Sequence, residues 1–221
     1  MSPLWRILLF IMYMQYANYH RKSPTILPPS FYLSNDILKV SQQLLGKLLF
    51  TNINGARTAG IIIETEAYAG IYDRASHSYN NNKTKRNEAM FSKGGIAYIY
   101  LCYGIHNLFN VVTNTEKDPQ AVLIRAIEPT IGIQNMLKRR KIDKLSHNLT
   151  SGPGKLSEAL GLSLDYNKTS LQGPNIGIYN IERNIPDSRV MKSKRIGVDY
   201  AGKDALNLWR FKIKDNPWCS K

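Results

Sequence analysis

The chain has 221 residues, 43% of them hydrophobic, which is enough to build one globular domain around a single core. Its 30 Lys and Arg outnumber 16 Asp and Glu, which gives a net charge of +14. This charge favours a polyanionic binding partner, and nucleic acid more than an anionic membrane surface. Charge alone also fits a basic protein with no such partner. The only cysteines are Cys102 and Cys219, and no Cys-x-x-Cys occurs, which argues against a disulfide framework, a structural zinc site or a zinc-dependent deaminase and favours a reducing compartment.

The N-terminal residues 1–30 show no folding pattern. The apolar run Ile7–Met14 is too short to span a bilayer, and no small-x-small cleavage site follows it as a secretory signal would require. Met12 and Met14 are alternative starts, so we expect residues 1–30 to be a disordered or spurious extension. Residues 22–29 are polar and proline-rich, which predicts a linker into the domain.

The first predicted element of the domain is a helix. Ser34, Asn35 and Asp36 offer N-cap chemistry, and Gly46 indicates the C-terminal end. Between and just beyond them runs an apolar stripe at helical spacing, formed by Ile37, Leu38, Leu44, Leu45 and Leu48. The run 59–68 then predicts a strand with acidic residues at its C-terminal end, and 73–88 a polar loop.

A β-hairpin is predicted from two strand-like runs, 96–102 and 107–113. Gly104 supplies the positive φ of a tight turn, and Tyr103 falls at the tip. Because side chains alternate along a strand, Tyr98 and Tyr100 share one face. By the same rule a third strand over 121–127, ending before Pro129, places Leu123 and Arg125 on one face.

Two further helices are predicted. Residues 133–140 form a basic helix, which carries Lys138, Arg139 and Arg140 and is followed by Lys141. Residues 150–155 predict the start of another helix, whose free N–H groups are a ready phosphate site.

Strand-like runs at 190–198 and 208–213 complete the chain. The order of elements predicts an α+β fold over residues 31–221: a single mixed domain around a curved, mainly antiparallel sheet with a protruding β-hairpin.

Glu66 stands where the predicted strand 59–68 leaves the core, and His77 and two tyrosines follow within the next segment. A carboxylate, an imidazole and several aromatic rings suggest a pocket that stacks a flat ring and activates a water. The plainer interpretation is that these tyrosines are half-buried strand residues and that Glu66 is a solvated turn residue. Composition alone favours the plainer interpretation.

Several separated blocks of sequence resemble the alkyladenine (3-methyladenine) DNA glycosylase family. They run in order from about Leu33 to Ser220, and their number makes a chance match improbable. The blocks are Glu64-Thr-Glu-Ala-Tyr-Ala-Gly, Ala75-Ser-His-Ser, Lys85-Arg-Asn-Glu-Ala-Met-Phe, Tyr98-Ile-Tyr-Leu-Cys-Tyr-Gly-Ile-His, Phe109-Asn-Val-Val, Ala121-Val-Leu-Ile-Arg-Ala-Ile-Glu-Pro, Thr150-Ser-Gly-Pro-Gly-Lys-Leu, Arg195-Ile-Gly-Val-Asp-Tyr-Ala-Gly, Trp209-Arg-Phe and Asn216-Pro-Trp.

The resemblance implies a role for individual residues. Glu66 would be the general base that activates the attacking water, and Arg125 would help to hold that water. Tyr68 and His77 would lie on one face of the flipped base and Tyr100 on the other. A second set completes the site: Asn110 would reject guanine through its amino group, Tyr103 would wedge into the minor groove, and phosphate contacts would come from Lys83, Lys85, Arg86, Ser151, Gly152 and Lys155.

These roles imply a monofunctional enzyme that acts on double-stranded DNA containing damaged purines and initiates base excision repair. Neither a cofactor nor a metal is expected, and the expected state is a cytoplasmic monomer, nucleoid-associated if the source is bacterial. Departures at His106 and Asn80–Asn82 leave the preferred lesion open, including whether deaminated purines are accepted.

Two alternatives remain open: a non-catalytic binder of damaged DNA, and an RNA-binding module. Glu66 distinguishes a glycosylase from a non-catalytic binder, because a binder would not need a carboxylate that repels the phosphates of DNA. The enzymatic hypothesis requires Glu66 to lie beside an aromatic slot that opens onto the basic surface.

Overall fold

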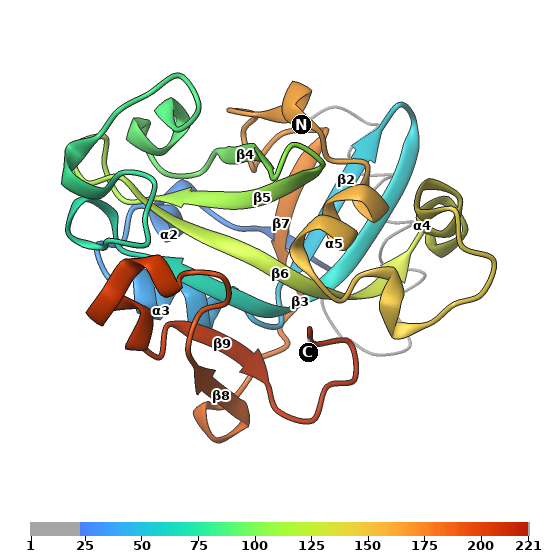
Figure 1. The fold of residues 1–221 in the computed structure, drawn as a ribbon. Coiled ribbons are helices and arrows are strands. Elements are labelled where there is room, and N and C mark those ends of the chain that lie inside the picture. Colours follow the sequence, from blue (N-terminus) through green and yellow to red (C-terminus); the bar gives the residue numbers. More distant parts are fainter. Residues whose placement is uncertain (1–22, 221) are drawn as a thin grey trace.

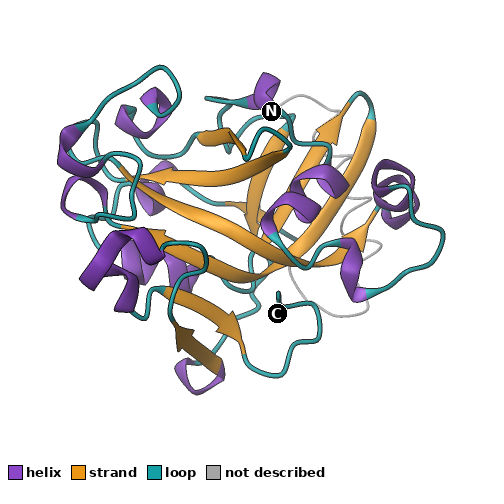
Figure 2. Ribbon diagram, in the orientation of Figure 1, coloured by secondary structure: helices purple, strands orange, loops and turns teal. Residues whose placement is uncertain are grey.

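The computed structural model describes residues 23–220, and these form one α+β domain around a curved nine-stranded sheet (Figures 1 and 2). The main path of the sheet has the strand order β1-β7-β2-β3-β6-β5-β4, while β9 pairs with β3 and β8 with β9. Every pairing is antiparallel, so the predicted fold class is confirmed.

The strands are β1 (Thr25–Ile26), β2 (Leu48–Ile53), β3 (Ala56–Tyr68), β4 (Ala97–Cys102), β5 (His106–Thr113), β6 (Gln120–Ile131), β7 (Ile176–Asn180), β8 (Val190–Ser193) and β9 (Arg210–Ile213). The α-helices are α2 (Pro29–Tyr32), α3 (Ile37–Gln43), α4 (Ile133–Arg140) and α5 (Pro153–Leu160). The 3-10 segments are η1 (Gly70–Tyr72), η2 (Tyr79–Asn81), η3 (Glu88–Phe91), η4 (His147–Leu149), η5 (Leu164–Tyr166), η6 (Asp187–Arg189) and η7 (Asp199–Leu206). Within residues 23–220 no helix has the length and apolarity needed to cross a membrane.

The predicted first helix is too long at its C-terminal end. Helix α3 stops at Gln43, and Gly46 turns the chain at φ +81°. Leu48 therefore begins β2, a strand that the sequence pattern did not reveal because its run of buried apolar residues continues the helical spacing. The β2–β3 turn is Asn54-Gly55, and both residues have positive φ, as a type I′ turn requires.

Two other boundaries are corrected. Residues 1–22 of the predicted extension 1–30 lie outside the described residues. In the predicted linker 22–29, Thr25–Ile26 instead pairs with β7 as a short edge strand, and Leu27 is buried in the core. Strand β6 does not end before Pro129 but runs on to Ile131. Pro129 faces Gly60 next to a register shift, and an irregular ladder tolerates a residue without an N–H group.

Two small apolar clusters lie outside the main core. One packs Met90 of η3 beneath Tyr98 and Val112, and the other joins Ala75 to Val198 and Ala201. Tyr100 packs against the first cluster and Tyr68 against the second. These two clusters support the aromatic residues of the site described below.

Candidate active site

A cleft of about 710 Å³ opens between the β4–β5 hairpin, the end of β3, the start of α5 and the segment 196–200. Nine predicted site residues line it: Tyr68, His77, Arg86, Tyr100, Tyr103, Asn110, Arg125, Gly152 and Lys155. The predicted residues Lys83, Lys85 and Ser151 do not line it; both lysines are exposed on the neighbouring loop, and Ser151 forms a β-bridge with Ala126. Glu66 lies behind the lining and is fully buried.

Sheet register explains why these side chains converge. Tyr98 pairs with Asn110, Asn110 with Leu123, and Leu123 with Glu66, so one row crosses four neighbouring strands. Alternation puts Tyr100, Leu108 and Arg125 on the same face two residues away. The predicted shared faces of Tyr98 with Tyr100 and of Leu123 with Arg125 are therefore confirmed.

Arg125 occupies a β-bulge. Glu64 pairs with Ala126 and Thr65 with Ile124, which leaves Arg125 as the extra residue of β6. Its backbone is still satisfied, because its carbonyl accepts a hydrogen bond from Gly152 N–H at 3.1 Å. A bulge re-aims the side chain of the residue it contains, and here the guanidinium reaches both acidic residues of β3.

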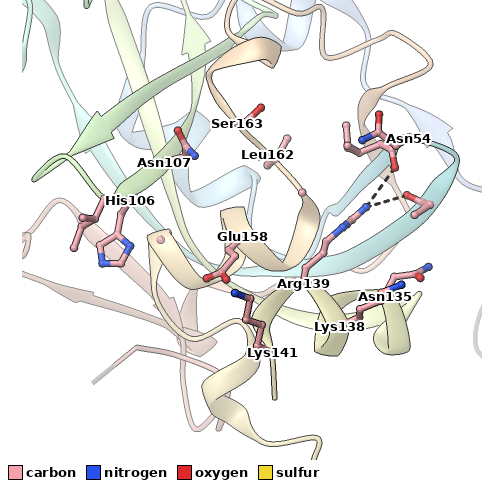
Figure 3. A pocket seen from close by; sticks show the side chains of 15 residues that line it. Asn54, His106, Asn107, Asn135, Lys138, Arg139, Lys141, Glu158, Leu162 and Ser163 are labelled. Atoms are coloured by element: carbon pink, nitrogen blue, oxygen red, sulfur yellow. Dashed lines mark hydrogen bonds between the residues drawn. The ribbon is translucent and has the colours of Figure 1, made fainter. Parts of the chain in front are cut away.

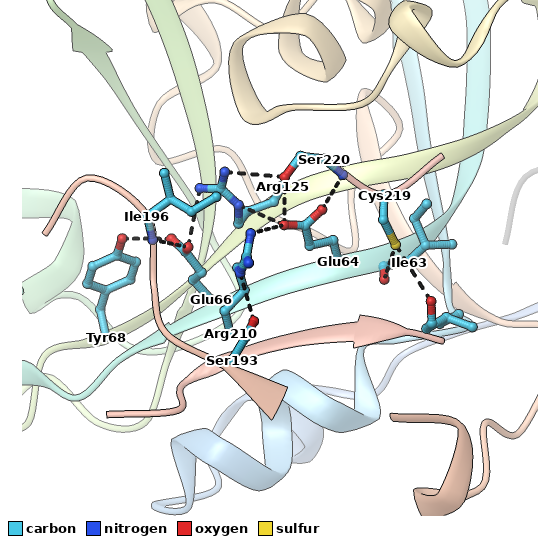
Figure 4. Close-up of polar contacts among 11 residues, drawn as sticks. Ile63, Glu64, Glu66, Tyr68, Arg125, Ser193, Ile196, Arg210, Cys219 and Ser220 are labelled. Carbon is cyan, nitrogen blue, oxygen red and sulfur yellow. Dashed lines mark hydrogen bonds and ion pairs between the residues drawn. The ribbon is translucent and has the colours of Figure 1, made fainter. Parts of the chain in front are cut away.

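Glu64 and Glu66 are both fully buried on one face of β3, and Arg125 bridges them (Figure 4). Arg125 Nε donates to Glu64 Oε1 at 3.0 Å, and Arg125 Nη1 lies 3.3 Å from Glu66 Oε1. Burial alone would lower the pKa of Arg125, but the two carboxylates raise it above its ordinary value. The guanidinium therefore stays charged and compensates both acids.

Glu64 has further partners that mark it as structural. Ser220 donates from its backbone N–H at 2.6 Å and from its hydroxyl at 2.7 Å, and Arg210 Nη1 donates at 3.4 Å. Four donors surround this carboxylate when Arg125 is included. It has no capacity left for a substrate or water, since a carboxylate offers about four acceptor sites.

Glu66 is less fully engaged. Oε1 accepts from the Ile196 N–H at 2.8 Å and faces Arg125, while Oε2 accepts from the Tyr68 hydroxyl at 2.9 Å (Figure 4). Burial, followed by the Glu66 charge, raises the pKa of Tyr68 well above its ordinary value, so the phenol remains a donor. Three donors leave about one acceptor position on Glu66. Tyr68, Arg125 and Ile196, which hold it, all line the cleft.

An aromatic group forms the opposite wall. Tyr98 and Tyr100 stack with ring centroids 5.4 Å apart, and His77 Nδ1 lies 2.7 Å from the Tyr98 hydroxyl. Arg86 covers the outer side of Tyr100, with its guanidinium carbon 5.1 Å from the ring centroid. Burial, followed by the charge of Arg86, lowers the pKa of His77 to about 4, so this imidazole is neutral near pH 7. Tyr98 acts here as a buried partner that orients His77.

One part of the predicted pocket is corrected by these rings. The resemblance implied that His77 and Tyr100 lie on opposite faces of the bound base, but their centroids are 4.6 Å apart and the rings meet edge to face. Two rings in edge-to-face contact leave no room for a base between them. His77 and Tyr100 therefore belong to the same wall, and Tyr68 stands apart from them.

Arg195 belongs to one of the sequence blocks but had no expected role, and the structure shows what it contacts. Its guanidinium carbon lies 5.0 Å from the ring centroids of both Tyr68 and Trp209, and its two terminal nitrogens bind the carboxylate of Asp73 at 2.5 and 2.9 Å. It thereby holds the ring of Tyr68 in place and fixes the neighbouring Ile196 N–H on Glu66. The sequence offered one signal for a role of Arg195 at the site: it belongs to the same block as Tyr200, which also lines the cleft.

The hairpin tip stands clear of the domain. Tyr103 is 87% exposed with φ +50°, and Gly104 follows at φ +72°, where a Cβ would have no atom within 4 Å. The predicted positive φ of Gly104 is confirmed. Tyr103 also adopts a positive φ, which costs a residue with a Cβ about 1–2 kcal/mol. The strained backbone turns a large ring toward solvent at the edge of the cleft.

Comparison with known proteins places this geometry in a family. The profile described as methylpurine-DNA glycosylase (MPG) matches residues 30–217. The chain belongs to the methylpurine-DNA glycosylase family. A protein of Chlamydia abortus, named as a candidate 3-methyladenine DNA glycosylase, is 50% identical over 187 residues, which cover 84% of this chain and 97% of the relative. Relatives so named from Clostridium tetani and Bacillus cereus are 44% and 43% identical and cover 86% and 88% of this chain and 97% and 98% of their own.

The glycosylase is therefore an enzyme that hydrolyses an N-glycosidic bond in DNA, as the sequence blocks predicted. The alternatives of a non-catalytic DNA binder and an RNA-binding module lose their support. Among residues 23–220 no group of three or more His, Cys, Asp or Glu side chains is placed to hold a metal ion.

The low pKa of His77 predicts a pH-dependent stability. Between pH 6.5 and about 4 the unfolded chain binds a proton on His77 that the folded glycosylase does not. The free energy of unfolding should therefore fall as the pH is lowered through this window, by at most about 1.4 kcal/mol per pH unit from this residue.

Urea unfolding of wild type and of His77→Gln across that window measures the effect. The variant should have the shallower dependence, and the His77 ring proton should titrate near pH 4 by NMR. Titration of that ring near 6.5, with equal pH dependence in both proteins, would contradict the burial argument.

Proposed function

We propose that this glycosylase is monofunctional and that it releases 3-methyladenine and other alkylated purines from duplex DNA with a water activated by Glu66. One observation carries the proposal. A buried carboxylate with about one acceptor position left is hydrogen-bonded to Tyr68, and Tyr68 lines a cleft whose other wall is aromatic. A water between Glu66 and the cleft would also be within the reach of Arg125, which faces both.

Base flipping follows from the depth of this carboxylate. A stacked nucleotide cannot present its glycosidic bond to a fully buried group, so the nucleotide must leave the duplex at a cost of a few kcal/mol. Tyr103 supports the proposal, because an exposed ring at a hairpin tip can fill the vacated space and recover part of the cost by stacking.

The chemistry of the walls favours alkylated purines. Alkylation at N3 or N7 makes the purine cationic, and a cation gains about 0.5–2 kcal/mol over an aromatic face. We place the base between Tyr68 on one side and His77 with Tyr100 on the other. Because His77 is neutral near pH 7, its ring does not repel a positively charged base. A deaminated purine is neutral and lacks this gain, so we expect slower release of hypoxanthine.

Asn110 suits the role of rejecting guanine. Its Nδ2 donates to the carbonyls of Tyr98 and Leu108 at 3.1 and 3.3 Å, which fixes the amide on the floor of the cleft. A fixed amide cannot move aside for the exocyclic amino group of guanine.

The same positive charge that favours stacking makes the purine a good leaving group, so a single general base suffices and no Schiff-base lysine is required. The cleft lining contains Lys155, whose Nζ is hydrogen-bonded to Asn148, and does not contain Lys93. Phosphate contacts are assigned to Arg86, Gly152 and Lys155 at the rim, with Lys83, Lys85 and Ser151 farther out.

Glu66→Gln should retain binding to a damaged duplex and lose base release, because glutamine keeps the shape but cannot accept a proton. A general base is worth about 10²–10⁴-fold in rate. The measurement is single-turnover release from a duplex with one 3-methyladenine or hypoxanthine, followed by alkaline cleavage at abasic sites. Thermal unfolding of the variant controls for loss of fold, and release at the wild-type rate would refute the assigned role.

Tyr103→Ala should weaken the preference for damaged over normal duplex by about 1–3 kcal/mol, the value of one base–aromatic stack. Equilibrium binding to matched duplexes with and without the lesion measures it. Tyr72→Ala is the control, since Tyr72 is 85% exposed but lies outside the cleft. An equal loss of affinity for both duplexes in Tyr103→Ala would mean that this ring is not the wedge.

A further inference from the structure

A second hollow, which we name the cationic groove, adjoins the hairpin tip. It encloses about 700 Å³ between α4, α5, the β2–β3 turn and the hairpin (Figure 3). His106 and Gly154 border both this groove and the cleft, and a Cβ on Gly154 would lie 2.9 Å from His106 Cγ. His106, the first residue of β5, therefore rests on the start of α5, and the two hollows meet at this contact.

The groove carries positive charge that no acidic side chain among the described residues neutralises. Of the four consecutive basic residues 138–141, Arg139 is committed to the carbonyls of Ala159, Ile53 and Ala56, and Arg140 pairs with Glu158. Lys138 and Lys141 are exposed, line the groove, and have no carboxylate at ion-pair distance among residues 23–220.

Stabilisation of a helix accounts for part of this charge. Basic residues in the last turn of α4 interact favourably with the negative end of the helix dipole. Lys138, Arg139 and Arg140 all lie in that turn, and Lys141 is beyond it at the left-handed C-cap position. The dipole thus accounts for Lys138 but not for Lys141, and it does not explain why both lysines line the same hollow next to the hairpin.

We propose that the cationic groove binds the sugar–phosphate backbone of the duplex on the side of the hairpin away from the cleft, with Lys138 and Lys141 at phosphates. The proposal rests on the function proposed above, in which Tyr103 enters the duplex and the extruded nucleotide occupies the cleft. The backbone beyond the tip must then run past the groove wall formed by Ile105, His106 and Asn107. Glu158 also lines the groove, and Arg140 compensates its carboxylate through an ion pair. The two lysines and the amides of Asn107 and Asn135 suit a phosphodiester chain.

The test compares the double variant Lys138→Gln/Lys141→Gln with the control Lys39→Gln/Lys214→Gln. Both lose two exposed positive charges, but Lys39 on α3 and Lys214 after β9 lie outside both hollows. Dissociation constants for a lesion duplex are measured from about 50 to 200 mM salt. Each lost phosphate contact should reduce the slope of log K against log salt by about 0.9, and two contacts should weaken binding roughly tenfold to sixtyfold at 0.1 M salt. The control should keep the wild-type slope.

Two further measurements sharpen the result. Lys138→Arg/Lys141→Arg should restore the slope, and shortening the duplex arm that reaches the groove should weaken wild type but not the glutamine variant. The proposal would be overturned if the slope changed equally in the test and control variants, or in neither. It would also be overturned if the glutamine variant lost affinity for duplex RNA alone.

Single-turnover base release at saturating protein separates this proposal from the function above. The glutamine variant should release the base at the wild-type rate, because neither lysine lies in the cleft. If wild type released no base while the slope difference persisted, the glycosylase mechanism would fail and the groove would stand.

Discussion

Two carboxylates buried on one face of a single strand set the central constraint of this molecule. Two like charges in a water-excluded site repel each other strongly unless a cation lies between them. Arg125 fills that position between Glu64 and Glu66, and Arg210 adds a second cation at Glu64. Such a network adds little net stability over apolar packing, but removing one member leaves an uncompensated buried charge. Its value here is orientation: one carboxylate is saturated by donors, and the other keeps about one acceptor position and is held by residues that line the cleft.

The remaining features of the site follow from holding that geometry. The bulge in β6 aims Arg125 at both acids, and the Arg195–Asp73 pair fixes the ring of Tyr68 from behind. Two satellite clusters support the walls: Tyr100 packs against one cluster and Tyr68 against the other. The hairpin then extends from the same sheet and carries its exposed tip beyond the cleft. A rigid sheet thus positions the chemistry, while the parts that would meet DNA stand at its edge.

Local rules made much of this predictable from sequence. Strand alternation placed Tyr98 with Tyr100 and Leu123 with Arg125, and Gly104 marked the turn. The sequence could not reveal contacts between distant segments, such as Ser220 on Glu64, 156 residues apart, or Arg195 on Asp73, 122 apart. Strand β2 also escaped prediction, because an apolar run that is buried on both faces carries no period of its own. The arrangement of His77 against Tyr100 depends on the Tyr98 hydroxyl, a tertiary contact with no signature in the spacing.

The most direct measurement is a structure of the glycosylase bound to a duplex whose damaged nucleotide carries a fluorinated sugar that resists cleavage. The account predicts that the purine lies between Tyr68 and the His77–Tyr100 wall. It also predicts one water within hydrogen-bond distance, about 2.6–3.2 Å, of Glu66 and facing C1′ of the flipped sugar. A purine still stacked in the duplex would contradict the account, as would a flipped one whose C1′ faces a group other than a Glu66-bound water.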